Sequence, residues 1–225
     1  MTESVQSEPK AANKGEPHWP ASLAVVLALA LYVTLPDRLI LGPRWVLPVL
    51  ELALLVPLTL HSPRRHHEEA SWVRRVSVGL IALVNLANVA NLALLAHYLV
   101  VGGHQSPDQG RQLIYSSFQI WLTNVLIFGL WYWELDRCGP TGRTRDPLPR
   151  PDFMFPQMAN PDIAPPGWKP SFLDYSYTSF TNASAFSPTD TMPLTSIAKI
   201  LMGIQSTASL LTVVLVAARA VNVLG

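Results

Sequence analysis

Residues 171–224 decide the fold. Residues 197–224 read IAKILMGIQSTASLLTVVLVAARAVNVL, an apolar run longer than the roughly 20 residues that a transmembrane helix needs. Residues 171–184 read SFLDYSYTSFTNAS; they contain no Pro or Gly and follow Pro170, which favours a helix start. Residues 185–195, AFSPTDTMPLT, contain two prolines and predict non-helical backbone. A short helix, an extended polar segment and a long apolar helix together predict a re-entrant loop, because non-helical backbone at membrane depth must lie inside protein or beside water.

Four further apolar runs precede this region, at Ala21–Leu35, Leu39–Leu60, Val76–Val101 and Leu113–Trp133. The first run resembles a secretory signal in length, but it lacks a small-residue cleavage site, so we interpret it as a retained span. The sequence therefore predicts an all-α membrane protein with about five transmembrane helices and a re-entrant, pore-helix and filter-like loop before the last one. Residues 1–17 are polar and predict a flexible tail, and residues 18–112 hold the first three spans.

The composition supports a membrane location. Of 225 residues, 49% are hydrophobic and only 14% are charged, whereas soluble domains carry about 25% charged residues. The net charge of +1 provides no basic field for a nucleic acid, so the expected partner is the lipid bilayer. The single cysteine excludes an intrachain disulfide, and no Cys/His spacing indicates a metal site. We expect no cofactor, and no nucleophile–base pair points to an enzyme.

A motif follows the predicted short helix. Asp190, Pro193, Thr195, Ala198 and Lys199 give the pattern D-x-x-P-x-T-x-x-A-K. This pattern resembles D-x-x-P-x-T-x-x-G-R, which follows the selectivity filter in potassium channels and related tetrameric cation channels. The resemblance covers residues 113–225 and implies a pore-like module: an outer helix, a Pro-rich loop at 137–170, a pore helix at 171–184, a filter-like segment at 185–195 and an inner helix. It also implies a homotetramer, because one pore loop per chain requires four chains to enclose a path for monovalent cations.

The filter itself differs from that of potassium channels. In potassium channels the filter carbonyls replace the hydration shell of the ion, and glycines give the backbone the conformations that this needs. Those glycines are missing here, and Pro188 fixes its own φ near −65°. The expected ion ligands are therefore hydroxyls and a carboxylate, and four copies of Asp190 would form a ring that attracts cations. The candidate filter and ion-pathway residues are Thr181, Asn182, Ser184, Phe186, Ser187, Pro188, Thr189 and Asp190. An alternative interpretation makes Asp190 the cap of the last helix and the loop a closed plug.

The whole chain is also similar to a family of uncharacterised bacterial integral membrane proteins, through the stretches WLTNVLIFGLWYWELDR, SFTNASAFSPTDTMPLT and LVAARAVNVL. That resemblance implies a multi-pass protein of the bacterial inner membrane and implies no function. The favoured function is a cation-conducting pore with a non-standard filter.

Polar side chains inside the predicted spans leave alternatives open. Gln205, Ser209 and Thr212 share one face of the last helix, where they would line a pore or join helices by hydrogen bonds. Asn85, Asn88 and Asn91 in the third span favour interhelical bonding. Glu51 in the second span is an intramembrane carboxylate, and such groups are functional candidates. It supports one alternative to a pore, an ion- or proton-coupled solute transporter using Glu51, although Glu51 could also be protonated or hydrogen-bonded to an Asn. A further alternative is a non-conducting structural or partner-binding subunit.

The sequence leaves the membrane orientation open. Lys and Arg gather on the side of the N-terminus and of the pore-like loop, which the positive-inside rule assigns to the cytoplasm. The channel resemblance implies the opposite orientation, with the filter on the outer side.

Overall fold

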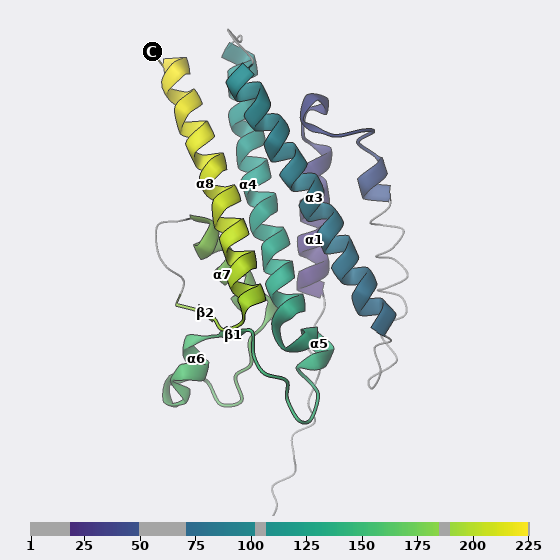
Figure 1. Ribbon diagram of the computed structural model, residues 1–225, viewed down its shortest axis with the longest axis vertical. Coiled ribbons are helices and arrows are strands. Elements are labelled where there is room, and N and C mark those ends of the chain that lie inside the picture. The colour runs from purple at the N-terminus through teal and green to yellow at the C-terminus, as the bar shows by residue number, and fades with distance from the viewer. Residues whose placement is uncertain (1–18, 50–70, 102–106, 185–189, 225) are drawn as a thin grey trace, which may run out of the picture.

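The computed structural model describes residues 19–49, 71–101, 107–184 and 190–224, and these are mostly helical (Figure 1). In chain order the elements are α1 (Trp19–Val33), η1 (Asp37–Leu39), α3 (Ser71–Val101), α4 (Pro107–Leu135), η3 (Asp136–Cys138), α5 (Gly139–Gly142), β1 (Phe153–Met154), α6 (Pro156–Ala159), η4 (Pro161–Ile163), α7 (Phe172–Ser184), β2 (Met192–Pro193) and α8 (Ser196–Leu224).

Three stretches within the described ranges are long and apolar enough to cross a membrane: Arg74–Val101, Gly110–Gly142 and Ser196–Ala218. They correspond to α3, α4 with the turns that follow it, and α8. Helix α1 is apolar but has only 15 residues. By length and composition these are helices of a membrane protein, and the described residues hold three candidate spans where the sequence predicted about five.

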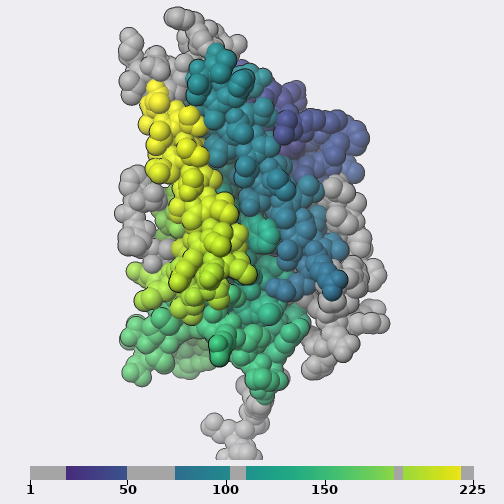
Figure 2. Space-filling model, in the orientation of Figure 1, coloured from purple at the N-terminus to yellow at the C-terminus, as the bar shows by residue number. Residues whose placement is uncertain are grey.

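Helix α4 is the centre of the bundle, since it packs against α1, α3, α7 and α8. One core cluster includes Phe128 and Tyr132 of α4 with Tyr175 of α7, and a second includes Leu95 of α3 and Ile120 of α4. Helices α3 and α8 lie beside each other on the face in Figure 2. Their outer surfaces are apolar; the exposed residues include Leu86, Val89, Ile200, Ile204, Leu211 and Val214.

Helix α7 begins at one end of the bundle and ends half-way along it. Its first residue, Phe172, packs edge-to-face on Trp133 near the end of α4, with ring centroids 5.9 Å apart. Near its last residue, the Ala183 carbonyl accepts a hydrogen bond from the indole of Trp121, in the middle of α4, at 3.4 Å. With 13 residues at about 1.5 Å each, α7 is roughly 20 Å long, too short to cross a bilayer.

The start of α7 is fixed by a capping box. The carboxylate of Asp174 accepts hydrogen bonds from the backbone N–H and from the hydroxyl of Ser171, both at 2.7 Å. This arrangement satisfies donors that a helix N-terminus leaves without partners. The sequence-predicted short helix at 171–184 agrees with α7 to within one residue.

After the undescribed residues 185–189, the chain returns to the end where α7 starts (Figure 1). The hydroxyl of Thr178 lies 3.2 Å from that of Thr191. Met192–Pro193 pairs antiparallel with Phe153–Met154, and the backbone N–H of Leu194 donates to the Asp152 carbonyl at 2.8 Å. Helix α8 then begins beside the start of α7.

Two expectations need correction. The second predicted span cannot begin as a helix at Leu39, because residues 40–45 are not helical and Gly42 has a φ of +81° ahead of Pro43; helical backbone resumes at Val46, and residues 50–60 lie outside the described ranges. The cap of α8 is Thr195 and not Asp190, since the Thr195 hydroxyl accepts a hydrogen bond from the backbone N–H of Ala198 at 3.3 Å. The two residues Met192–Pro193 form a strand in between, so Asp190 lies too far from the helix to cap it.

Candidate functional site

A network of neutral polar side chains joins α4, α7 and α8 in the interior of the bundle. Gln205 of α8 is fully buried, and its amide nitrogen donates to the carbonyl and to the hydroxyl of Ser179 in α7, at 2.9 and 2.7 Å. The Ser179 hydroxyl donates to the Val125 carbonyl of α4 at 2.7 Å. The amide oxygen of Gln205 accepts from the phenol of Tyr132 in α4. One amide of α8 thus bonds to groups on two other helices, α4 and α7, as burial in an apolar medium requires.

Asn182 extends this network at the end of α7. Its amide nitrogen donates to the Gln205 oxygen at 2.7 Å and to the Met202 carbonyl at 3.0 Å. Its amide oxygen accepts from the hydroxyl of Ser206 at 3.0 Å. These bonds hold the C-terminal end of α7 beside Met202, Gln205 and Ser206, within the Ser196–Ala218 stretch of α8.

The predicted stripe on α8 lies within this packed interior. Gln205, Ser209 and Thr212 are all buried, and the amide of Asn124 in α4 donates to the Ser209 hydroxyl at 2.9 Å. Within one chain Gln205 and Ser209 bond to α7 and α4, which favours the interhelical alternative over pore lining. The Thr212 hydroxyl donates to the Ala208 carbonyl within α8 itself, at 2.8 Å.

The remaining predicted ion-pathway residues divide into two groups. Those described are Thr181 and Ser184, whose hydroxyls bond to carbonyls within α7, and Asp190, whose side chain is exposed. Phe186, Ser187, Pro188 and Thr189 lie outside the described residues, as does Glu51. The ion-pathway role of all of these remains a prediction.

The asparagines of α3 differ from one another. Asn88 and Asn91 are buried, and with its amide nitrogen facing the acceptors Asn91 donates to the Leu39 carbonyl at 2.7 Å. It therefore ties α3 to η1. Asn85 is half-buried, and its amide oxygen has no partner among the described residues.

A second polar cluster, at the end of the bundle, was missed by the sequence analysis. Asp136, immediately after α4, is 1% exposed. One carboxylate oxygen accepts from the backbone N–H groups of Asp152 and Phe153 at 2.7 and 3.3 Å, and the other accepts from the phenol of Tyr175 in α7 at 2.6 Å. Asp152 in turn accepts from the Thr195 hydroxyl at 2.8 Å. This carboxylate cluster fixes the starts of α7 and α8 to the end of α4.

Arg143 packs beside the carboxylate cluster. It is 7% exposed and donates to the carbonyls of Trp133 and Asp136 at 2.8 and 3.0 Å. Its guanidinium also lies over the rings of Trp133 and Tyr175, 5.7 and 5.2 Å from their centroids. These are cation–π distances. The only feature of the sequence that could have indicated the carboxylate cluster is the position of Asp136 directly at the end of an apolar run, in the stretch WYWELDR.

Comparisons with protein-family models, with curated proteins and with solved structures give no match for this chain.

Proposed function

We propose that the chain is the subunit of a cation-conducting membrane pore, in which four copies place the C-terminal end of α7 and residues 185–190 around a central axis. One observation carries the proposal: α7 ends half-way along the bundle between α4 and α8, and the chain then returns to the end where α7 began. A segment that enters and leaves a membrane on the same side must lie inside protein or line water. This chain provides the inner wall of such a segment, and neighbouring copies would provide the outer wall.

The electrostatics of this arrangement favour cations. A helix carries roughly half a negative charge at its C-terminus, and the C-terminal end of α7 points into the middle of the bundle. Asp190 follows residues 185–189, and its side chain is exposed on the surface of the single chain. Four such carboxylates around one axis would concentrate cations at the mouth of the path. The network around Gln205 contains only neutral groups, so it fixes the position of α7 without adding a competing charge.

The face of α8 that remains for the axis lies opposite the Gln205 stripe. Gly203 and Thr207 are exposed there, and a side chain added at Gly203 would meet no atom within 4 Å. Leu211 is 52% exposed on the same face. We therefore assign the lining of the inner vestibule to Gly203, Thr207 and Leu211 in place of the predicted stripe.

The sequence leaves two orientations open, and we propose the one that the charges favour. Arg74, Arg75, Arg143, Arg145 and Lys199 belong to the end of the bundle where α7 starts, whereas Arg38, Arg44 and Arg111 belong to the other end (Figure 1). The positive-inside rule then places the α7 end in the cytoplasm of a bacterial inner membrane. Cys138, the sole cysteine, is exposed at this end. An impermeant maleimide should label it in inverted vesicles and not in intact spheroplasts; labelling of spheroplasts would reverse the orientation.

The test is cation flux into liposomes that contain the purified full-length protein. We expect flux of monovalent cations that falls severalfold in the Asp190→Asn variant and is unchanged in Asp162→Asn. Asp162 is an exposed aspartate of η4 and controls for the loss of one negative charge. Absence of flux from a folded wild-type tetramer would reject conduction and leave a structural or partner-binding subunit. Flux that requires a proton gradient and is abolished by Glu51→Gln would instead favour the transporter.

A further inference from the structure

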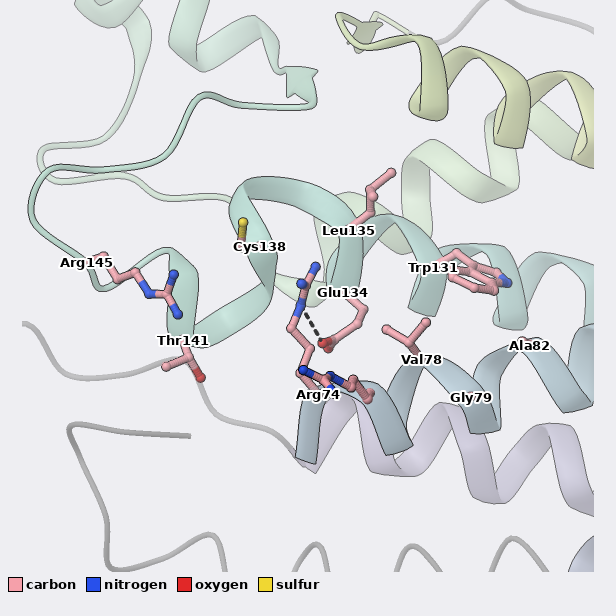
Figure 3. Close-up of a pocket in the computed structure, with 11 residues that line it drawn as sticks. Arg74, Val78, Gly79, Ala82, Trp131, Glu134, Leu135, Cys138, Thr141 and Arg145 are labelled. Carbon is pink, nitrogen blue, oxygen red and sulfur yellow. Dashed lines mark ion pairs between the residues drawn. The ribbon is translucent and has the colours of Figure 1, made fainter. Parts of the chain in front are cut away.

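A cavity of about 650 Å³ lies between the first turns of α3 and the last turns of α4, outside the polar network around Gln205 (Figure 3). Three arginines line it: Arg74 and Arg75 of α3, and Arg145, which follows α5. Glu134 of α4 is the one carboxylate among its lining residues. The cavity is therefore positively charged, with three guanidinium groups against one carboxylate.

The ion pair in the cavity leaves donors available. Arg74 Nε lies 3.6 Å from Glu134 Oε1, beyond hydrogen-bond distance, and this nitrogen is buried without a hydrogen-bond partner among the described residues (Figure 3). The Glu134 side chain is only 9% exposed, whereas that of Arg74 is 41% exposed. Arg75 and Arg145 are exposed at the rim. Guanidinium groups in such a cluster match the oxygens of a phosphate, to which they donate in pairs.

The rest of the cavity wall is apolar. Val78 and Ala82 of α3 face Trp131 of α4 across it, deeper in the bundle than the arginines (Figure 3). Arg74 is the first residue of the apolar stretch Arg74–Val101, so the arginines lie where that span meets the membrane surface. A charged rim above an apolar wall, at the boundary of a bilayer, fits a molecule with an anionic head and a hydrocarbon tail.

We infer that this cavity binds the phosphate headgroup of an anionic phospholipid, with Arg74, Arg75 and Arg145 contacting the phosphate and one acyl chain lying along Val78 and Ala82. The inference rests on the membrane placement of α3 and α4 and is independent of ion conduction. A free phosphate would present the same oxygens, but it would leave the apolar wall uncovered.

The experiment uses the delipidated full-length protein in detergent, with bound lipid counted by native mass spectrometry. The probes are phosphatidylglycerol, phosphatidylcholine and soluble glycerol phosphate at equal concentrations. The variants are Arg145→Gln, which removes one rim charge, and Gly79→Leu, which fills the cavity. A Cβ added at position 79 would meet no atom within 4 Å, and leucine favours a helix over glycine, so this variant should fold. Arg150→Gln is the control, because Arg150 is also exposed after α5 but does not line the cavity.

We expect the wild-type protein to retain phosphatidylglycerol in preference to phosphatidylcholine. Arg145→Gln should retain it about tenfold less, as the loss of a charge-assisted hydrogen bond predicts. Gly79→Leu should also retain less because leucine occupies the space of the acyl chain, and Arg150→Gln should behave like the wild type. Equal retention of the two lipids, or equal effects of Arg145→Gln and Arg150→Gln, would overturn the inference. Binding of soluble glycerol phosphate as strong as that of the lipid would identify a site for free phosphate and would also overturn it. If Gly79→Leu loses its helical content, the comparison of lipid retention between Arg145→Gln and Arg150→Gln decides whether the cavity binds the headgroup.

Discussion

The amide nitrogen of Gln205 in α8 donates to both the carbonyl and the hydroxyl of Ser179 in α7, at 2.9 and 2.7 Å. The same amide accepts from Tyr132 and Asn182 through its oxygen, so every hydrogen-bonding position of the side chain is occupied. Helix α7 is too short to cross a membrane, and its outer side exposes Leu173, Tyr177 and Phe180. On its inner side, Gln205 and the groups around it hold α7 against α4 and α8.

Replacing Gln205 with leucine should destabilise the protein. The change removes the acceptor of the buried Tyr132 hydroxyl and one of the partners of Ser179 and of Asn182. A buried polar group left without a partner costs roughly 1–3 kcal/mol. We expect a lower midpoint in SDS-induced unfolding followed by circular dichroism. The control is Thr207→Val on the exposed face of α8, where the hydroxyl donates to the Gly203 carbonyl of the same helix. Equal midpoints for the two variants would mean that the Gln205 network does not hold α7.

Removing the Tyr175 hydroxyl tests the carboxylate cluster. In Tyr175→Phe the buried Asp136 carboxylate loses a donor at 2.6 Å, and a hydrogen bond to a charged group contributes roughly 1.5–3 kcal/mol. Tyr177→Phe makes the same chemical change two residues away on a side chain that is 61% exposed, and it should leave stability unchanged. The free energies of unfolding of the two variants are compared in the same detergent. If Tyr175→Phe is as stable as Tyr177→Phe, the hydrogen bond from Tyr175 to Asp136 does not anchor α7.

These two contacts also show where sequence reasoning ends. The pattern SFLDYSYTSFTNAS predicts a helix because it lacks breakers and follows a proline, and α7 agrees with it. The long apolar run at residues 197–224 predicts α8 because it too contains no breaker and is long enough to span a membrane. Hydrophobic length and breakers act within a few residues along the chain, so they can be read without knowing the partners.

The partners of Gln205 could not be predicted, because a polar stripe on a helix is equally suited to water and to a neighbouring helix. Only the position of α7 decides that this face is interior. Asp136 acts through its contact with Tyr175, which lies 39 positions later in the sequence. No pattern in the residues next to Asp136 predicts this contact. The capping role assigned to Asp190 failed for a related reason, since the pairing of Met192–Pro193 with β1 delays the start of α8 to Ser196.

Gly142 should be intolerant of substitution. An added Cβ would collide with the backbone carbonyl of Arg137, at the tight reversal that follows α4. Arg137 and Cys138 already have left-handed φ values of 53° and 64°, so the backbone has little freedom to move aside. Gly142→Ala should therefore lower the thermal midpoint. In Gly203→Ala the new methyl group meets no atom within 4 Å, and the gain in helix propensity, up to about 1 kcal/mol, should raise it. A Gly142→Ala variant at least as stable as Gly203→Ala would contradict this packing.

Cysteine crosslinking distinguishes the two faces of α8 and tests the proposed four-copy pore. In a Cys138→Ser background, Thr207→Cys places a thiol on the exposed face that we assign to the axis, where copies of the same residue approach one another. Mild oxidation in native membranes should then give covalent dimers on a non-reducing gel.

Ser209→Cys is the matched control, because Ser209 is 1% exposed and faces Asn124 within its own chain. Dimers from Ser209→Cys and none from Thr207→Cys would place the opposite face of α8 at the interface between copies. Absence of crosslinks from both variants, in a protein that migrates as a tetramer, would place α8 away from the axis and remove the basis for assigning the pore lining to Thr207.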